Sequence, residues 1–279
     1  MRLADYVFLK EFDLRYLSSM LIKIQREIAE SRKIMFIEVS ALERIDVFKA
    51  LVAWIENSDG RNLKNLTLLI HNGDKIPTKS FYELLVRCGV KVFSVNASVN
   101  NYGVTPLPIG LENRHLRKNG IGLHFSIPQD GTFKVNSGAG CKTDLFASFN
   151  VSTNMNERSK VKSELLKHGY SFTEPNLTTE RYQNCLKNSR FVISPPGNGI
   201  DCHRTWEAIY LGAVPIVLRT CLNEELIKLF PIIAVSEWSE FLETSDAERE
   251  ILISKFDGVK YPAMNIEYWQ GLFMNSKDK

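Results

Sequence analysis

The chain alternates short apolar runs with longer amphipathic stretches, and this alternation predicts its elements. In the first third of the sequence, three apolar runs are typical of buried strands: residues 33–40, 66–71 and 90–95. Amphipathic stretches before and between them predict helices at residues 13–32, 41–57 and 77–87. An order of strand, helix, strand, helix, strand indicates a parallel sheet that is covered on both faces.

The alternation resumes in the second half, after an interval of glycine, proline and asparagine at residues 96–141. Apolar runs predict strands at residues 144–150, 191–193, 214–218 and 232–235. We therefore expect an α/β protein with two Rossmann-like domains, whose parallel sheets face a cleft. The expected bounds are 1–125 for the first domain, 126–262 for the second, and 263–279 for a C-terminal helix that packs back towards the first.

One segment, Arg190–Arg219, combines a strand, a turn, a helix and a second strand. Two prolines and two glycines end the first strand abruptly, and Asp201 is expected to cap the helix that follows. At 100° per residue, one stripe of this helix is apolar and is expected to pack: Cys202, Trp206, Ile209 and Ala213. The other side is expected to carry chemistry: His203, Arg204 and Glu207.

The residue types of this turn fit a nucleotide. Asn198 and Gly199 allow the backbone to approach a ligand closely, and the free N–H groups of a helix start favour a phosphate. Arg204 can bind the phosphate with two nitrogens, and Glu207 can accept hydrogen bonds from a ribose diol. The alternative is an ordinary strand-to-helix turn whose polar side chains face solvent.

The same segment resembles the C-terminal signature of exostosin-type glycosyltransferases. The resemblance is carried by Gly197, Asn198, Gly199, Asp201, His203, Arg204, Trp206, Glu207, Ala208, Leu211, Gly212, Pro215, Ile216 and Val217, and more weakly by residues 106–112. It implies a GT-B fold in which this segment belongs to the half that binds the donor, a nucleotide sugar such as a UDP-sugar. The glutamate, Glu207 here, is implicated in holding the ribose. The expected activity is transfer of the sugar to a glycan or lipid-linked acceptor, in bacterial surface polysaccharide synthesis.

In such a two-domain transferase, the nucleotide lies at the carboxyl ends of the strands of the second domain. Asn150 ends the first of these strands, and Arg158 and Lys162 share a face of the next helix, from which they could reach the diphosphate. Surface ion pairing is the alternative for both basic residues. A nucleotide- or sugar-binding protein without turnover is the alternative for the whole chain.

The first domain is expected to supply a general base for an inverting reaction. His71 and Asp74 directly follow the strand at residues 66–71, at the carboxyl edge where a parallel sheet exposes its ligands. Glu112, in the loop expected at the cleft, is the third candidate. The alternative for the 71–74 segment is a polar turn in which Asp74 caps the helix that begins near Pro77.

Charge and cysteine content narrow the setting. A net charge of +3 is too small to indicate nucleic-acid binding, although it permits peripheral association with an anionic membrane. Five cysteines without a C-x-x-C pair argue against a disulfide framework and a structural zinc. Without a D-x-D triplet, no metal is expected on the diphosphate, nor any tightly bound cofactor. We expect a cytoplasmic location, because no apolar run is long enough to span a bilayer and the first residues do not resemble a signal peptide.

Overall fold

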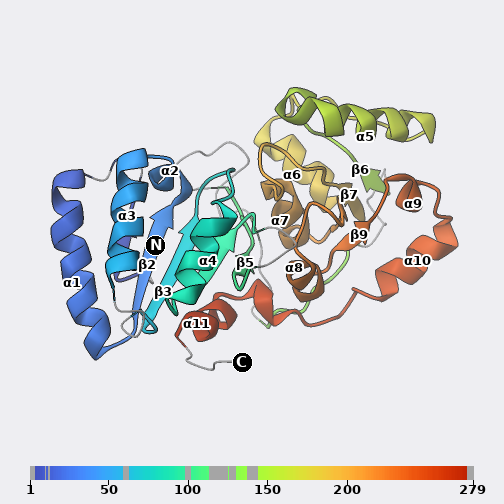
Figure 1. The fold of residues 1–279 in the computed structure, drawn as a ribbon. Coiled ribbons are helices and arrows are strands. Elements are labelled where there is room, and N and C mark those ends of the chain that lie inside the picture. The colour runs from blue at the N-terminus through green and yellow to red at the C-terminus, as the bar shows by residue number, and fades with distance from the viewer. Residues whose placement is uncertain are drawn as a thin grey trace. The chain divides into compact units, whose positions relative to one another are not determined.

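The computed structural model describes residues 4–9, 11, 13–58, 63–97, 102–112, 125, 130–136 and 144–274. The chain forms two compact units (Figure 1). The first combines Met1–Leu107 with Trp269–Lys279, and the second is the continuous segment Pro108–Tyr268. Each unit contains its own parallel sheet, which confirms the predicted α/β class and the two sheets.

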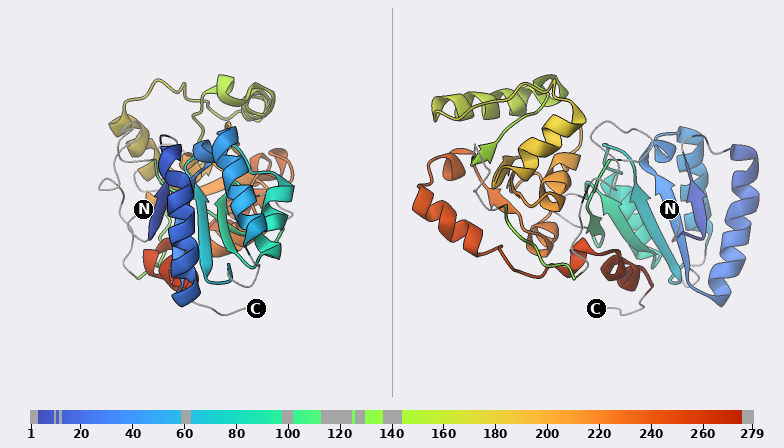
Figure 2. Two further views of the ribbon diagram at one scale, coloured as in Figure 1. Left: turned by 60° about the vertical axis from the view of Figure 1, so that its left-hand side comes forward. Right: turned by 180° about the vertical axis from the view of Figure 1, so that it is seen from behind.

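The first unit is built on a parallel sheet with the strand order β1-β2-β3-β4-β5. Its strands are β1 (Tyr6–Phe8), β2 (Lys33–Glu38), β3 (Leu66–His71), β4 (Lys91–Val95) and β5 (Thr105–Leu107). The connecting helices are η1 (Leu14–Tyr16), α1 (Leu17–Glu30), α2 (Val39–Leu42), α3 (Ile45–Asn57) and α4 (Lys79–Arg87). Sequential order with right-handed crossovers places α1, α3 and α4 next to one another on one face of the sheet (Figure 2).

The other face of this sheet binds the end of the chain. The register pairs Thr67 with Lys91 and Leu69 with Phe93, so these four side chains share a face. There the ring of Phe273, in helix α11 (Ile266–Met274), packs edge-on against Phe93 with the ring centroids 4.8 Å apart. Thr67 Oγ1 donates a hydrogen bond to the carbonyl of Phe273, and Lys91 Nζ donates one to the carbonyl of the preceding residue. The C-terminal segment is thus part of the first unit's core.

The second unit has a parallel sheet with the order β6-β7-β8-β9. Its strands are β6 (Leu145–Phe146), β7 (Phe191–Ile193), β8 (Val214–Leu218) and β9 (Ile233–Val235). Its helices are η3 (Val151–Asn154), α5 (Met155–Lys167), α6 (Thr179–Lys187), α7 (His203–Tyr210), α8 (Glu224–Leu229), α9 (Ser239–Leu242), α10 (Asp246–Ser254) and η4 (Pro262–Met264). Along β7 the side chains alternate: Val192 packs in a core with Leu186 of α6 and Ala208 of α7, whereas Phe191 meets Phe241 of α9.

The first unit ends at Leu107, eighteen residues before the predicted domain boundary at 125. The reason lies in two hydrogen bonds. The backbone N–H of Ile109 donates to Asp201 Oδ2 at 2.8 Å, and the carbonyl of Gly110 lies 2.7 Å from Nδ1 of His203. These bonds attach residues 108–110 to Asp201, in the turn before helix α7, and to His203 at the start of that helix, so this segment belongs to the second unit.

Two further expectations of local structure are corrected. The apolar run at residues 33–40 ends as a strand at Glu38, because Val39 and Ser40 begin the short helix α2. Helix α4 begins with Thr78 as its N-cap, whose side chain accepts from the N–H of Phe81, so Asp74 is not the cap.

Candidate functional site

The turn after β7 is shaped by its prolines and by Arg158. Pro195 and Pro196 have no backbone N–H, so they cannot donate the hydrogen bonds that would continue the strand. Their carbonyls remain available as acceptors. Arg158 of α5 binds them: its Nε donates to the carbonyl of Pro196 at 2.8 Å and its Nη2 to that of Pro195 at 3.5 Å. Its Nη1 donates to the carbonyl of Asn150 at 2.8 Å. Arg158 therefore joins the end of the first strand segment to the turn.

This arginine is almost completely buried, with 5% of its surface exposed. Burial, together with the neighbouring charge of Arg204, lowers the pKa of Arg158 to about 10, so it still carries its charge at neutral pH. Both guanidinium groups lie over the ring of Phe149, each with its central carbon 5.7 Å from the ring centroid. Phe149 therefore brings two like charges to one place.

Neither arginine has a carboxylate partner in the part of the chain that the structure describes. Among the described residues, no aspartate or glutamate oxygen lies within ion-pair distance of Arg158 or Arg204. Within the same part of the chain, the buried Nε of Arg204 has no hydrogen-bond partner, and a terminal nitrogen of this arginine only approaches the Cys202 sulfur at 4.0 Å. A buried and a half-buried cation, with no counter-charge among the described residues, are able to hold an anion.

Helix α7 is buried on more sides than its pattern predicted. Trp206 and Ile209 are buried as expected, but Glu207, expected on the side opposite this packing stripe, is also buried, with 1% of its surface exposed. Its Oε2 accepts a hydrogen bond of 2.8 Å from the hydroxyl of Tyr182, on α6. Burial and the nearby Glu207 carboxylate raise the pKa of Tyr182 well above its usual value, so the phenol keeps its proton and donates it.

Asp201 does not cap helix α7, contrary to the expectation. The N-cap residue is Cys202, and it makes no side-chain capping bond. The carboxylate of Asp201, 4% exposed, instead accepts from the indole N–H of Trp206 at 2.9 Å and from the backbone N–H of Ile109. Burial raises the pKa of Asp201 to about 6 despite these hydrogen bonds. Asp201 and His203 thus attach the 108–110 segment, which is a structural task.

The other residues expected to bind the nucleotide sugar have different surroundings. Asn150 caps η3, with its Oδ1 accepting from the N–H of Ser152 at 3.0 Å. Lys162 forms an ion pair with Glu174 at 2.8 Å and so has a counter-charge already. Asn198 is exposed and Gly199 is buried in the turn, where the carbonyl of Gly199 accepts from the N–H of Gly197 at 3.0 Å.

The comparisons with known proteins concern this second unit. Residues 142–259 match the family model of the RXYLT1 C-terminal domain, a glycosyltransferase-like family. The second unit resembles a glycosyltransferase-like domain. The match contains Arg158, Arg204 and Glu207, and it does not extend to the first unit. The narrower resemblance to exostosin-type enzymes stays a prediction.

Two solved structures align with most of the chain. One is an alpha-glucosyltransferase in complex with UDP and a 13-mer DNA, with 10% identity, a TM-score of 0.38, and coverage of 93% of this chain and 84% of that one. The other is described as trehalose-6-phosphate from E. coli bound with UDP-2-fluoro glucose, with 12% identity, a TM-score of 0.40, and coverage of 93% and 76%. At these TM-scores the likeness carries no argument for this chain. No curated protein sequence matches it.

The candidate bases lie outside the matched segment. His71 ends β3, and its Nδ1 lies 2.8 Å from the backbone nitrogen of Asn72 and 2.9 Å from the side-chain oxygen of the same residue. Asp74 is exposed. Asn96 Nδ2 binds the carbonyl of Gly73 at 3.0 Å and holds this turn against the end of β4. Glu112 belongs to the second unit, so the three candidates are divided between the units.

Two residues of the site were not anticipated from the sequence. Phe149 supplies the ring beneath both arginines, and Tyr182 supplies the hydroxyl that binds Glu207. Phe149 lies in the predicted strand at 144–150 and Tyr182 in helix α6, and nothing in the sequence around either residue distinguishes it from a core aromatic.

Within the described ranges, no group of three histidine, cysteine, aspartate or glutamate side chains is arranged to hold a metal ion. No helix in those ranges combines the length and apolar character needed to cross a bilayer.

Proposed function

We propose that the chain is a glycosyltransferase that uses a nucleotide-sugar donor, with a UDP-sugar as the expected donor. One observation carries the proposal: Arg158 and Arg204 lie together beside the glycine turn without a carboxylate partner among the described residues. The similarity of residues 142–259 to a glycosyltransferase-like domain supports it.

The two arginines fit different parts of the task of binding a diphosphate. Arg158 has its donors occupied by three carbonyls, so it acts as a fixed positive charge that supports the turn. Arg204 retains donors that no described residue uses, so it is the group able to bind phosphate oxygens directly. An anion beside them would offset the repulsion and desolvation that lower the pKa of Arg158.

We assign the ribose of the donor to Glu207. A carboxylate offers about four acceptor positions. The hydroxyl of Tyr182 takes one of them on Oε2 and thereby fixes the orientation of the group. A ribose diol has two hydroxyl donors, which suit an acceptor that is both ionised and held in one orientation.

In the reaction, an acceptor hydroxyl oxygen forms a bond to the anomeric carbon while the bond from that carbon to the diphosphate breaks. The negative charge that develops on the departing diphosphate is stabilised by Arg204 and by the fixed charge of Arg158. If the configuration inverts, a base takes the hydroxyl proton in the same step. His71, Asp74 and Glu112 are the proposed bases. A glycan or lipid-linked glycan is the proposed acceptor, and synthesis of a bacterial surface polysaccharide is the proposed setting.

The donor assignment is tested by calorimetric titration with UDP and with uridine. Arg204→Gln should weaken UDP at least about tenfold, because charge-assisted hydrogen bonds contribute about 1.5 to 3 kcal/mol each. The affinity for uridine, which has no phosphate, should stay the same. Lys162→Gln is the matched control: it removes one positive charge from α5, but its partner is Glu174, so UDP affinity should not change.

The opposite result would be an Arg204→Gln variant that is folded, as judged by circular dichroism, and binds UDP like the parent. Turnover is tested separately by incubating the protein with a panel of nucleotide sugars and measuring the release of the nucleoside diphosphate. Tight binding of UDP without any release, with acceptors added, would identify a nucleotide-binding protein instead of an enzyme.

A further inference from the structure

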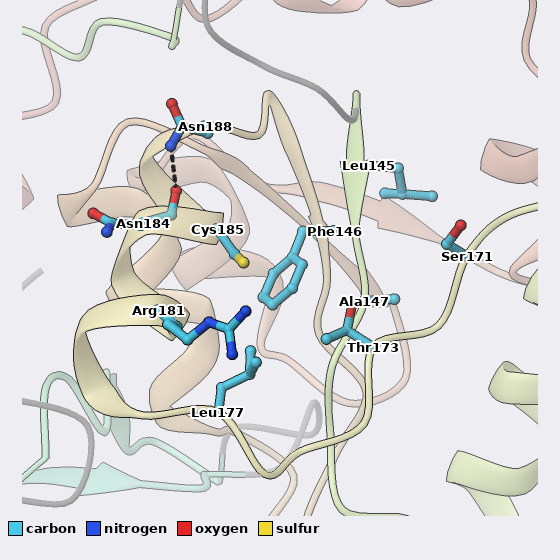
Figure 3. Close-up of a pocket in the computed structure, with 10 residues that line it drawn as sticks. All are labelled: Leu145, Phe146, Ala147, Ser171, Thr173, Leu177, Arg181, Asn184, Cys185 and Asn188. Atoms are coloured by element: carbon cyan, nitrogen blue, oxygen red, sulfur yellow. Dashed lines mark hydrogen bonds between the residues drawn. The ribbon is translucent and has the colours of Figure 1, made fainter.

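A cavity of about 550 Å³ lies along the outer edge of the second unit's sheet (Figure 3). Strand β6 is the terminal strand in the order β6-β7-β8-β9, so one of its edges faces away from the sheet. Leu145 and Phe146 of β6, with Leu177, form the apolar floor of the cavity. A volume of this size is within the usual range of small-molecule sites. None of the lining residues belongs to the anion site of Arg158 and Arg204.

Polar groups stand on opposite sides of this floor. Helix α6 contributes Arg181 and Asn184 on one side, and the hydroxyls of Ser171 and Thr173 lie on the other (Figure 3). Within the described part of the chain, these four side chains make no hydrogen bond or ion pair. Arg181 is the charged residue in the lining, and no acidic residue of the described chain accompanies it there.

We propose that this cavity binds an anionic sugar unit, whose carboxylate or phosphate group pairs with Arg181. The ring of such a sugar has an apolar C–H face that suits the floor. Its hydroxyls lie around the ring, where Asn184, Ser171 and Thr173 offer donors and acceptors on both sides. Arg181, Asn184 and Ser171 are exposed to solvent, and a fatty acid would pack on the floor but make few hydrogen bonds to them. A neutral sugar would make no charge-assisted hydrogen bond with Arg181.

Cys185 provides a local reporter, because its half-buried thiol is part of the cavity wall. Burial raises the pKa of this thiol, so its alkylation is slow enough to follow in time. The intact protein is treated with iodoacetamide, and labelling of each cysteine is followed by peptide mass spectrometry. D-Glucuronate and D-glucose 6-phosphate are the anionic probes, and D-glucose is the neutral one. Cys88, in the first unit, serves as the internal reference.

We expect at least one anionic sugar to slow labelling of Cys185 several-fold at saturation, with no effect on Cys88, whereas D-glucose gives no protection at the same concentration. Protection by one anionic probe identifies the preferred anion. Arg181→Gln should raise the concentration needed for half-protection at least about tenfold. Lys187→Gln, on the same helix but outside this cavity, should leave it unchanged.

Three results would overturn the proposal: no protection by either anionic sugar, equal protection by D-glucose, or unchanged protection in Arg181→Gln. Burial raises the pKa of the Cys185 thiol and the charge of Arg181 lowers it, so Arg181→Gln also changes the rate at which the free protein is labelled. For this reason the ratio of labelling rates with and without sugar is compared, and not the rate alone. UDP is a further arm. If UDP protects Cys185 at the concentration that saturates the anion site, the cavity is the nucleoside end of that site and the separate site is refuted. A negative result in any of these labelling experiments does not affect the Arg204 titrations, which test the proposed donor site independently.

Discussion

Replacing Asp201 by asparagine should change how stability depends on pH. In the folded protein this carboxylate is 4% exposed, and burial raises its pKa to about 6 although Trp206 and Ile109 donate hydrogen bonds to it. In the unfolded chain it titrates near its ordinary value of 3.8. Asparagine keeps the shape of the side chain and does not titrate, so the difference between the two proteins isolates this one group.

The sign follows from the raised pKa. Below about pH 3.8 the group is protonated in both states, and the native state carries no cost of a buried charge. As the pH rises from there to about 6, the unfolded chain releases the proton while the native state keeps it, so stability falls. A difference of about two pKa units corresponds to about 3 kcal/mol in total, of which about 2 kcal/mol is lost between pH 4 and pH 7.

The assay is denaturant unfolding of both proteins at several pH values from 4 to 8. The free energy of unfolding of the parent, minus that of Asp201→Asn, should fall by about 2 kcal/mol over this range and then stay level. Titrating groups that do not interact with Asp201 cancel in the subtraction. A difference that stays constant with pH, or that rises, would show that the carboxylate is ionised in the folded protein throughout and would refute the reasoning.

Three other predictions concern the proposed reaction. Tyr182→Phe removes the hydroxyl that fixes Glu207, so UDP should bind roughly tenfold more weakly, and the preference for UDP over 2′-deoxy-UDP should narrow in parallel titrations. Chelation with EDTA should leave turnover unchanged, because arginine charges neutralise the diphosphate; lost activity restored by Mn²⁺ would contradict this. At saturating donor, one of His71→Ala, Asp74→Asn and Glu112→Gln should lower kcat by about 10² to 10⁴ without weakening UDP. Turnover within about threefold of the parent in all three variants would place the base elsewhere.

The periodic part of the fold could be predicted because burial controls it. Apolar runs identified the strands at 66–71 and 214–218 to the residue, since parallel strands covered on both faces are apolar throughout. Strands β1 and β5 were missed, although β7, which also has three residues, was predicted. Pro106 made β5 harder still to recognise, although proline is compatible with its position at the sheet edge.

The candidate site was predicted in composition but not in contacts. Arg204 and Glu207 were identified from residue type and from the turn that precedes them. Their surroundings depend on residues far away in sequence: Tyr182 is 25 positions from Glu207, and Ile109 is 92 positions from Asp201. Asp201 is a residue type that often caps helices, which is why it was predicted as an N-cap. Its carboxylate instead accepts hydrogen bonds from the indole N–H of Trp206 and the backbone N–H of Ile109. Hydrophobic periodicity contains no information about such partners.

The discontinuous first unit bears on the order of events during synthesis on the ribosome. Its sheet is made early, yet Phe273, which packs on Phe93, follows the whole of the second unit in the sequence. The second unit is one continuous segment and can fold as soon as Tyr268 has emerged. Throughout the intervening translation, the nascent first unit lacks Phe273 on one face of its sheet and exposes apolar surface there. Helix α11 therefore completes the first unit only after the second unit has been made. A ribosome that stalls before Trp269 would release a chain whose second unit is complete and whose first unit exposes apolar surface and is prone to aggregate.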